Sequence, residues 1–148
     1  MDRILFISIS LISIFTVLII GDVLYIGLWY YIAIPFVAYL LTLPFKPKQY
    51  FLTGVSLVIL LTYIPYFYHN LFAARPEGLL GLGHFFSLPG LAVGILLAGL
   101  YLKKKSLSSI SLFTIGFIVT LLGFLTNQLI VCKTVIYCGN LIWPLSLL

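Results

Sequence analysis

The chain of 148 residues is 63% hydrophobic and 7% charged, with 8 Lys and Arg against 3 Asp and Glu. Soluble globular domains are about 45–50% apolar and about 25% charged, so this chain has too little polar surface to cover a core in water. The composition excludes a soluble domain, a disordered tail and a coiled coil. It indicates an all-α integral membrane protein with several spans.

Five apolar stretches have the length of about 20 residues that a membrane-spanning helix needs. The predicted spans are residues 4–20, 23–43, 50–68, 85–102 and 110–131. Strands of a membrane barrel alternate in polarity over about 10 residues, whereas these stretches are apolar on every face. We therefore expect a polytopic bundle of helices in which residues 1–148 form a single transmembrane domain. A bundle of four spans is the alternative, because the two outer spans are the weakest candidates.

Basic residues indicate the orientation, since Lys and Arg in short loops stay on the cytoplasmic side of a membrane. With five spans and a cytoplasmic N-terminus, the inner side carries six of the eight basic residues. These six are Arg3, Lys46, Lys48, Lys103, Lys104 and Lys105, and the outer side carries Arg75 and Lys133. We therefore predict a cytoplasmic N-terminus, an external C-terminus and a bacterial-type inner membrane as the location.

Two of the predicted connections are unusual. Gly21 and Asp22 leave so little chain between the first two spans that these must form an antiparallel hairpin, unless the second helix begins near Gly27. The outer loop 69–88 is the longest connection, and its stretch 79–86 is apolar. We expect that stretch to lie in the membrane interface or to fold back against the bundle.

Ionisable groups near a span are costly in a membrane and mark candidate polar sites. The candidates on the predicted outer side are Asp22, His69, Arg75, Glu77 and His84. Asp22 after Gly is typical of a tight turn, although Arg75 or His69 could pair with it at an ion or proton site. The histidines and Glu77 match no zinc spacing, so we interpret the histidines as interfacial side chains. Neither a metal nor a cofactor is predicted.

Cys132 and Cys138 are the two cysteines of the chain, and the predicted topology places both on the outer side. In an oxidising compartment such a pair is expected to form a disulfide. A thiol relay is the alternative, but relays of this kind typically use Cys-x-x-Cys and a second pair that receives the electrons. We therefore predict a structural disulfide between these two residues.

Three adjacent aromatic residues in the second span suggest a contact with protein. Trp29, Tyr30 and Tyr31 point in three directions around a helix. An interfacial belt of aromatic rings explains most aromatic residues of this chain. It does not explain all three of these, so at least one ring should face the bundle or a partner.

Small residues recur every four positions in the fourth span, at Gly90, Gly94 and Ala98. We call these three residues the small-residue stripe. In a membrane such a stripe lets another helix approach closely. The approaching helix is either the last span, which carries Gly116 and Gly123, or a helix of another subunit.

The sequence offers little chemistry, and no catalytic residue is predicted. It contains no acid-base pair within a span, no Ser-His-Asp set, no phosphate-binding loop and no acidic metal cluster. Our leading hypothesis is a non-enzymatic protein that contacts another membrane protein, or a second copy of itself, within the lipid bilayer. It would be an accessory subunit of a complex, or an immunity-type protein against a membrane-active toxin.

Two other functions stay open at this stage. A small transporter or oligomeric channel would use Asp22, Arg75 and the proline-kinked spans. A membrane enzyme would act on lipids or thiols at the outer face through the histidines, Glu77 or the cysteines. No nucleic-acid partner is expected.

Overall fold

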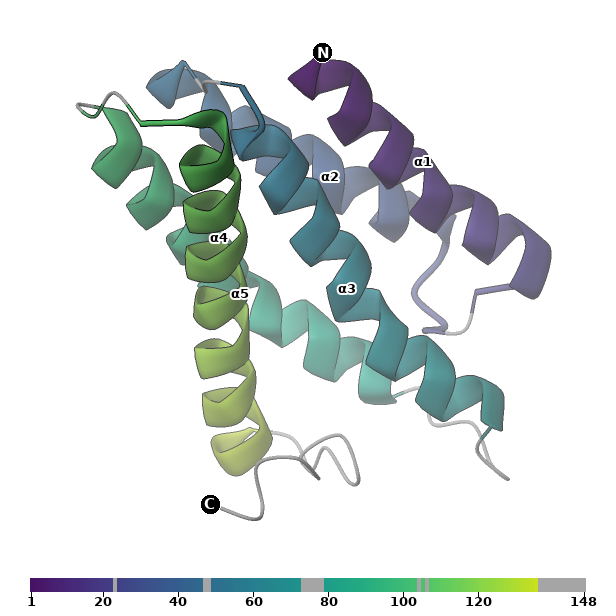
Figure 1. Ribbon diagram of the computed structural model, residues 1–148. Helices are drawn as coiled ribbons and strands as arrows, with labels where there is room; N and C mark the ends of the chain where they lie inside the picture. Colours follow the sequence, from purple (N-terminus) through teal and green to yellow (C-terminus); the bar gives the residue numbers. More distant parts are fainter. Residues whose placement is uncertain (23, 47–48, 73–78, 104, 106, 136–148) are drawn as a thin grey trace.

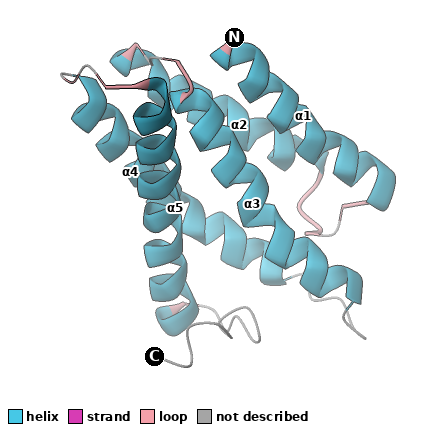
Figure 2. Cartoon of the chain, viewed as in Figure 1, coloured by secondary structure: helices cyan, strands magenta, loops and turns pink. Residues whose placement is uncertain are grey.

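The computed structural model describes residues 1–22, 24–46, 49–72, 79–103, 105 and 107–135. Over these ranges the chain is helical and contains no strand (Figure 2). The elements are α1 (Asp2–Ile20), α2 (Leu28–Thr42), the short 3₁₀ helix η1 (Leu43–Phe45), α3 (Phe51–Phe72), α4 (Leu79–Lys103) and α5 (Ser109–Thr134). Consecutive long helices run in opposite directions, so α1 begins and α5 ends at opposite ends of the bundle (Figure 1).

Within the described part of the chain, five helices are long and apolar enough to cross a membrane. They comprise Asp2–Ile20, Leu28–Phe45, Phe51–His69, Gly81–Lys103 and Ser109–Thr134. The all-helical class and the five apolar stretches are thereby confirmed. α3 is the most enclosed of the five, and it packs against both α1 and α5. α4 crosses α5 at close range and also contacts α2.

The second predicted span begins too early. Residues 24–27 are not helical, and α2 begins at Leu28, which agrees with the alternative start near Gly27. The backbone there adopts conformations with positive φ, at +97° for Gly21 and +100° for Gly27. Glycine adopts these angles readily, so the chain turns at both positions. Apolar composition alone does not reveal this, since residues 23–27 include Val23, Leu24 and Ile26.

The fourth helix begins earlier than predicted. Residues 79–84 were expected in an outer loop, but α4 starts at Leu79 and carries Pro89 in its interior. A proline removes one backbone hydrogen bond from a helix, and a neighbouring helix in a membrane protein can compensate. Pro89 leaves the carbonyl oxygen of Phe85 without its helical N–H partner, and at the next residue the side-chain amide of Asn127 on α5 donates to the carbonyl oxygen of Phe86 at 2.8 Å. Pro89 thus lies within α4 and does not mark the start of this helix.

Asp2 joins the beginnings of α1 and α3, a contact that the sequence analysis did not anticipate. Its carboxylate accepts hydrogen bonds from the backbone N–H groups of Leu52 at 3.1 Å and Thr53 at 2.9 Å. The first N–H groups of a helix lack partners within the helix, and Tyr50, just before α3, is not a capping residue. Asp2 therefore supplies the missing cap from another helix.

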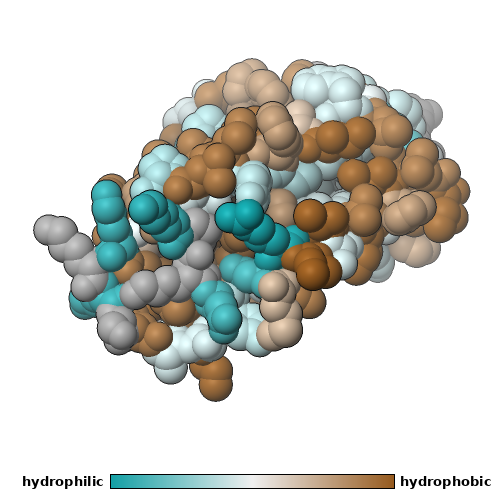
Figure 3. Space-filling model, turned by 90° about the horizontal axis from the view of Figure 1, so that it is seen from above, coloured by the Kyte–Doolittle hydropathy of each residue, from teal (hydrophilic) through white to brown (hydrophobic). Residues whose placement is uncertain are grey.

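Basic side chains gather at one end of the bundle. Arg3, Lys46, Lys103 and Lys105 are exposed where α1 begins and where α2 and α4 end. Viewed from above, this end shows a group of hydrophilic side chains beside apolar flanks (Figure 3). Lys48 and Lys104 of the predicted inner side lie outside the described residues. We call this end the basic end.

Candidate functional site

A buried histidine connects three helices in the interior of the bundle. His84 on α4 has no exposed surface. Its Nδ1 lies 2.6 Å from the hydroxyl of Tyr30 on α2, and its Nε2 lies 3.0 Å from Oγ1 of Thr62 on α3. The prediction that His84 is an interfacial side chain is therefore wrong. The early start of α4 carries the imidazole into the bundle.

The hydrogen bonds define the tautomer of His84. Thr62 donates its one hydroxyl hydrogen to the carbonyl oxygen of Ile59 at 2.7 Å, so its oxygen accepts from the Nε2–H of His84. The unprotonated Nδ1 then accepts from the hydroxyl of Tyr30. Both ring nitrogens are thus occupied by protein groups. A metal ion could bind this imidazole only if one of these hydrogen bonds broke.

Aromatic rings enclose the imidazole. Tyr63 stacks on it, with ring centroids 4.9 Å apart and planes inclined by 22°. Tyr66 meets it edge-on at 4.9 Å, and Phe124 of α5 is tilted against it at 5.2 Å. A neutral histidine with both nitrogens satisfied is tolerated in such surroundings, because buried polar groups are costly mainly when they lack partners. The cluster therefore holds α2, α3, α4 and α5 together.

Asp22 organises the turn between α1 and α2. Its carboxylate accepts from the backbone N–H groups of Leu24 and Gly27 and from the hydroxyl of Tyr31, the last at 2.9 Å. This agrees with the interpretation of Asp22 as a turn residue. Arg75, the alternative partner of Asp22, lies outside the described residues, and so does Glu77. His69 is half-buried in the last turn of α3.

The described residues contain no group of three or more His, Cys, Asp or Glu side chains that could hold a metal ion. His84 is enclosed, and His69 lies in a different helix near its end. Cys132 is buried near the end of α5, whereas Cys138 lies outside the described residues. The disulfide between the two cysteines therefore stays a prediction.

The three adjacent aromatic residues of α2 divide between interior and surface. Tyr30 and Tyr31 are 1% and 0% exposed, whereas Trp29 is 60% exposed. Tyr30 and Tyr31 both contact Tyr63 of α3. The expectation that at least one of these rings faces the bundle is confirmed for two. Trp29 lies on the outer surface of α2.

The small-residue stripe packs against the chain's own last helix. A Cβ atom added at Gly94 would lie 2.8 Å from both Cα of Thr120 and the carbonyl oxygen of Val119. A Cβ at Gly90 would overlap with the backbone of Gly123 in the same way. Of the two neighbours that the sequence left open, the structure brings α5 against the stripe, and the backbones of α4 and α5 touch there.

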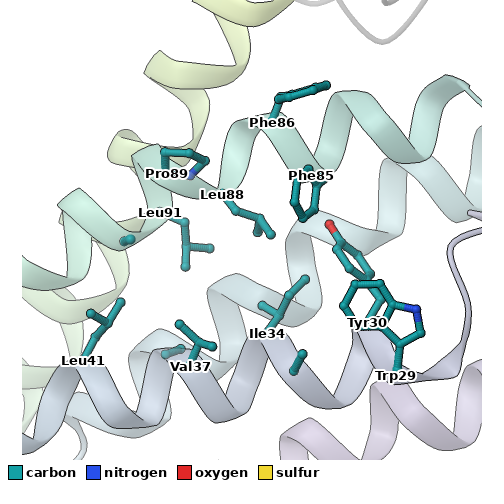
Figure 4. Close-up of a pocket in the computed structure, with 13 residues that line it drawn as sticks. Trp29, Tyr30, Ile34, Val37, Leu41, Phe85, Phe86, Leu88, Pro89 and Leu91 are labelled. Carbon is teal, nitrogen blue, oxygen red and sulfur yellow. The ribbon is translucent and has the colours of Figure 1, made fainter.

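Two grooves flank α4. One, of about 480 Å³, follows the contact with α5, and we call it the α4/α5 groove. Its lining combines apolar side chains with Gly90, Gly94, Gly123, Thr126 and Asn127. The other, of about 410 Å³, lies between α2 and α4, and we call it the α2/α4 groove. Figure 4 shows Leu88 and Leu91 of α4 facing Ile34 and Val37 of α2 across it.

No family model, curated protein or solved structure matches this chain. The site residues that the sequence analysis missed are Thr62 and Tyr63, which hold and cover the imidazole of His84. Both lie in an apolar stretch of α3. Their hydroxyl groups within that stretch were the signal in the sequence that could have pointed to a polar contact inside the bundle. Their role depends on how α3 and α4 are placed in space, which the local pattern does not contain.

Proposed function

We propose that this protein acts, without catalysis, by contact with another protein in the membrane, and that the α4/α5 groove is the contact surface. The observation that carries this proposal is an open groove between α4 and α5 whose lining combines small residues with an amide side chain. Helix association in a membrane depends on close packing and on hydrogen bonds between helices, since lipid chains are as apolar as the side chains.

The shape of the α4/α5 groove supports the proposal. Gly90, Gly94 and Gly123 line it, and the close contact that they allow between α4 and α5 leaves a depression of about 480 Å³ between the two helices. Val93 and Leu97 on α4, with Leu122 and Ile130 on α5, are each more than half exposed and form its two edges. Ridges of side chains on one helix pack into such depressions on another.

The chemistry of the groove supports it as well. Thr126 is exposed in the groove. Asn127 uses one N–H group on the carbonyl of Phe86, and among the described residues this is the hydrogen bond that its side chain makes. An amide has two N–H donors and an oxygen acceptor, so Asn127 retains capacity for a bond across an interface. A partner helix with a polar side chain at the matching depth would gain about 0.6 kcal/mol per hydrogen bond.

Filling the groove tests the proposal. Thr126→Trp adds a large side chain at an exposed groove position, and Leu100→Trp is the matched control at an exposed position of α4 outside the groove. A photo-crosslinking residue at position 97 should yield one discrete adduct in native membranes. Thr126→Trp should abolish that adduct at unchanged abundance, and Leu100→Trp should keep it.

The identity of the adduct separates two kinds of partner. Co-expressed copies with two different tags reveal whether the adduct is a second copy of this chain, and mass spectrometry identifies any other protein. An adduct that persists in Thr126→Trp, or a wild-type protein that forms no discrete adduct, would contradict the proposal.

The orientation and location belong to the same proposal. We infer that the protein spans a bacterial-type inner membrane five times, with the basic end in the cytoplasm. The exposed Arg3, Lys46, Lys103 and Lys105 support this, because basic residues are retained on the cytoplasmic side. A reporter fused after Leu148 should be active only outside the cytoplasm. Cytoplasmic activity of that fusion would contradict the orientation.

The cysteines provide a further test of the orientation. If the end of α5 faces an oxidising compartment, Cys132 and Cys138 should form a disulfide. Thiol-directed mass tags should then label the protein only after reduction. Labelling of both thiols without reductant would contradict an oxidised pair on the outer side.

A further inference from the structure

The α2/α4 groove differs from the α4/α5 groove in offering almost no polar group. It follows α2 from Trp29 to Leu41 and α4 from Phe85 to Ala92. Apart from backbone atoms, its lining residues carry two polar groups, the hydroxyl of Tyr30 and the indole N–H of Trp29. The hydroxyl of Tyr30 is committed to His84. A polar ligand would therefore lose its hydration in this groove without replacement.

The groove is long and apolar. At 1.5 Å of rise per residue, the stretch of α2 from Trp29 to Leu41 is about 18 Å long. Over that length the groove has a volume of about 410 Å³ and an almost entirely apolar lining. An extended hydrocarbon chain is the component of a bilayer that suits a lining of this length and polarity, because it has no polar group that would lose its hydration there.

The floor of the groove is fixed before anything binds. Ile34 and Leu91 are 7% and 4% exposed and belong to the hydrophobic core. Tyr30 lies at the end of the groove near Gly27, where its hydroxyl points toward α4 (Figure 4) and bonds to His84. A preformed groove loses little conformational entropy on binding, so a chain in it would be held longer than the freely exchanging lipid around it.

Trp29 gives the groove a direction. Its ring is 60% exposed and lies at the end of the groove away from the basic end. Tryptophan settles at the level of lipid head groups, with its ring in apolar surroundings and its N–H available as a donor. The ester carbonyl of a phospholipid lies at that level, and the acyl chain below it would run along α2 toward Leu41.

We propose that the α2/α4 groove binds one acyl chain of a bilayer phospholipid, with the ester group beside Trp29. The site is separate from the proposed protein contact, because it lies between α2 and α4. Its occupant comes from the bilayer itself and requires no partner protein. The lipid site rests on the proposed membrane-spanning arrangement but not on the proposed protein contact, so the two binding sites can fail independently.

A photoactivatable lipid tests this site. The probe is a phosphatidylcholine with a diazirine in the middle of one acyl chain, diluted into vesicles of phosphatidylethanolamine and phosphatidylglycerol that contain the purified full chain. After illumination, mass spectrometry should find the label concentrated on Val37, Leu88 and other groove residues. Exposed positions elsewhere, such as Ile118 on α5, should carry only the background that random contact with lipid produces.

A variant with a filled groove completes the test. Ala33 and Ala92 line the groove from its two helices, and Ala33→Phe with Ala92→Phe would place two rings where the chain lies. Labelling of the groove should fall to the background level, and Ile118→Phe should leave it unchanged as the matched control. Uniform labelling of all exposed residues in the wild type, or groove labelling that survives the double substitution, would overturn the proposal.

Folding is monitored separately. Each variant should keep the wild-type helical circular dichroism and elute as one species in mild detergent. If the double variant does not fold, Ala92→Leu alone provides the same comparison with a smaller added volume, and it should reduce the labelling of Leu88 and Val37 relative to the wild type. Equal labelling in Ala92→Leu and the wild type would count against the site.

Discussion

The two sides of α4 show how side-chain size determines the spacing of helices. Toward α5, Gly90 and Gly94 let the two backbones touch. Toward α2, Leu88 and Leu91 extend from α4 and keep the helices apart, so that an apolar groove remains. Close packing in a membrane stabilises helix contacts directly. The α5 side should therefore contribute close backbone packing, whereas the α2 side is held by ring contacts such as that of Tyr30 with Phe85 and by the hydrogen bond between Tyr30 and His84.

The largest expected effect comes from breaking the contact with α5. Gly94→Leu would force a side chain into the backbone of Thr120 and Val119. Overpacking of this kind costs about 3 kcal/mol, the upper part of the usual range, because backbone atoms cannot move aside as flexible side chains do. Unfolding in mixed micelles with increasing SDS should show this loss. Val93→Leu, at an exposed position next to Gly94, should stay near the wild type.

This experiment also decides between the two interpretations of the small-residue stripe. A destabilised and degraded Gly94→Leu protein is expected if the stripe packs on α5. A stable and abundant variant that has lost only its partner would instead mean that the stripe serves another subunit.

The second effect should come from removing the imidazole that connects α2 to the rest of the bundle. His84→Ala leaves the hydroxyl of Tyr30 without its partner and opens a cavity among the aromatic rings. We expect a loss of about 2 kcal/mol in the free energy of unfolding, from lost packing and two lost hydrogen bonds. The same SDS titration measures it. A wild-type transition would show that the cluster does not hold the helices together.

A smaller effect is expected when one hydrogen bond alone is removed. Tyr30→Phe keeps the ring and deletes the hydroxyl that donates to Nδ1 of His84. Bonds between helices in a membrane contribute about 0.6 kcal/mol on average, so the unfolding transition should shift only slightly. Tyr68→Phe is the control, because Tyr68 is 67% exposed. A loss as large as that of His84→Ala would mean that the hydroxyl, and not the packing of the ring, dominates the cluster.

The smallest effect is expected in the α2/α4 groove. Ala33→Phe adds a ring to space that the protein leaves open between α2 and α4. Substitutions away from packed or bonded groups usually change stability by less than about 0.5 kcal/mol. The melting temperature in mild detergent should therefore match that of the wild type. A strong destabilisation would show that the two helices already touch at Ala33 and that no groove exists there.

The sequence predicted the five apolar helices because composition and length determine them. It placed two boundaries wrongly, and in both cases the cause lies in backbone chemistry. Gly21 and Gly27 turn the chain within an apolar stretch, while Pro89 is accommodated in α4 beside Asn127. Apolar content does not separate an apolar turn from the start of a helix.

The candidate site was predictable only in part. Helical geometry predicted that at least one ring among Trp29, Tyr30 and Tyr31 faces the bundle or a partner, without saying which, and the spacing of Gly90 and Gly94 predicted the approach of a helix. The position of His84 did not, because its partners lie on α2 and α3 and are brought to it by the fold. The sequence around a histidine can be equally apolar whether the side chain lies at a membrane surface or is hydrogen-bonded in the interior of a bundle.

The cap that Asp2 places on α3 has a consequence for how the bundle assembles. α1 precedes α2 and α3 in the chain, yet it packs more extensively against α3 than against α2. The carboxylate of Asp2 cannot accept hydrogen bonds from the N–H groups of Leu52 and Thr53 until α3 has formed beside α1. Before that, α1 contacts α2, through the turn at Asp22 and through Phe6, whose ring lies against Tyr39. α1 therefore reaches its final place only after the third helix arrives, and a truncated chain that stops before α3 would leave the N-terminal acid without its partner.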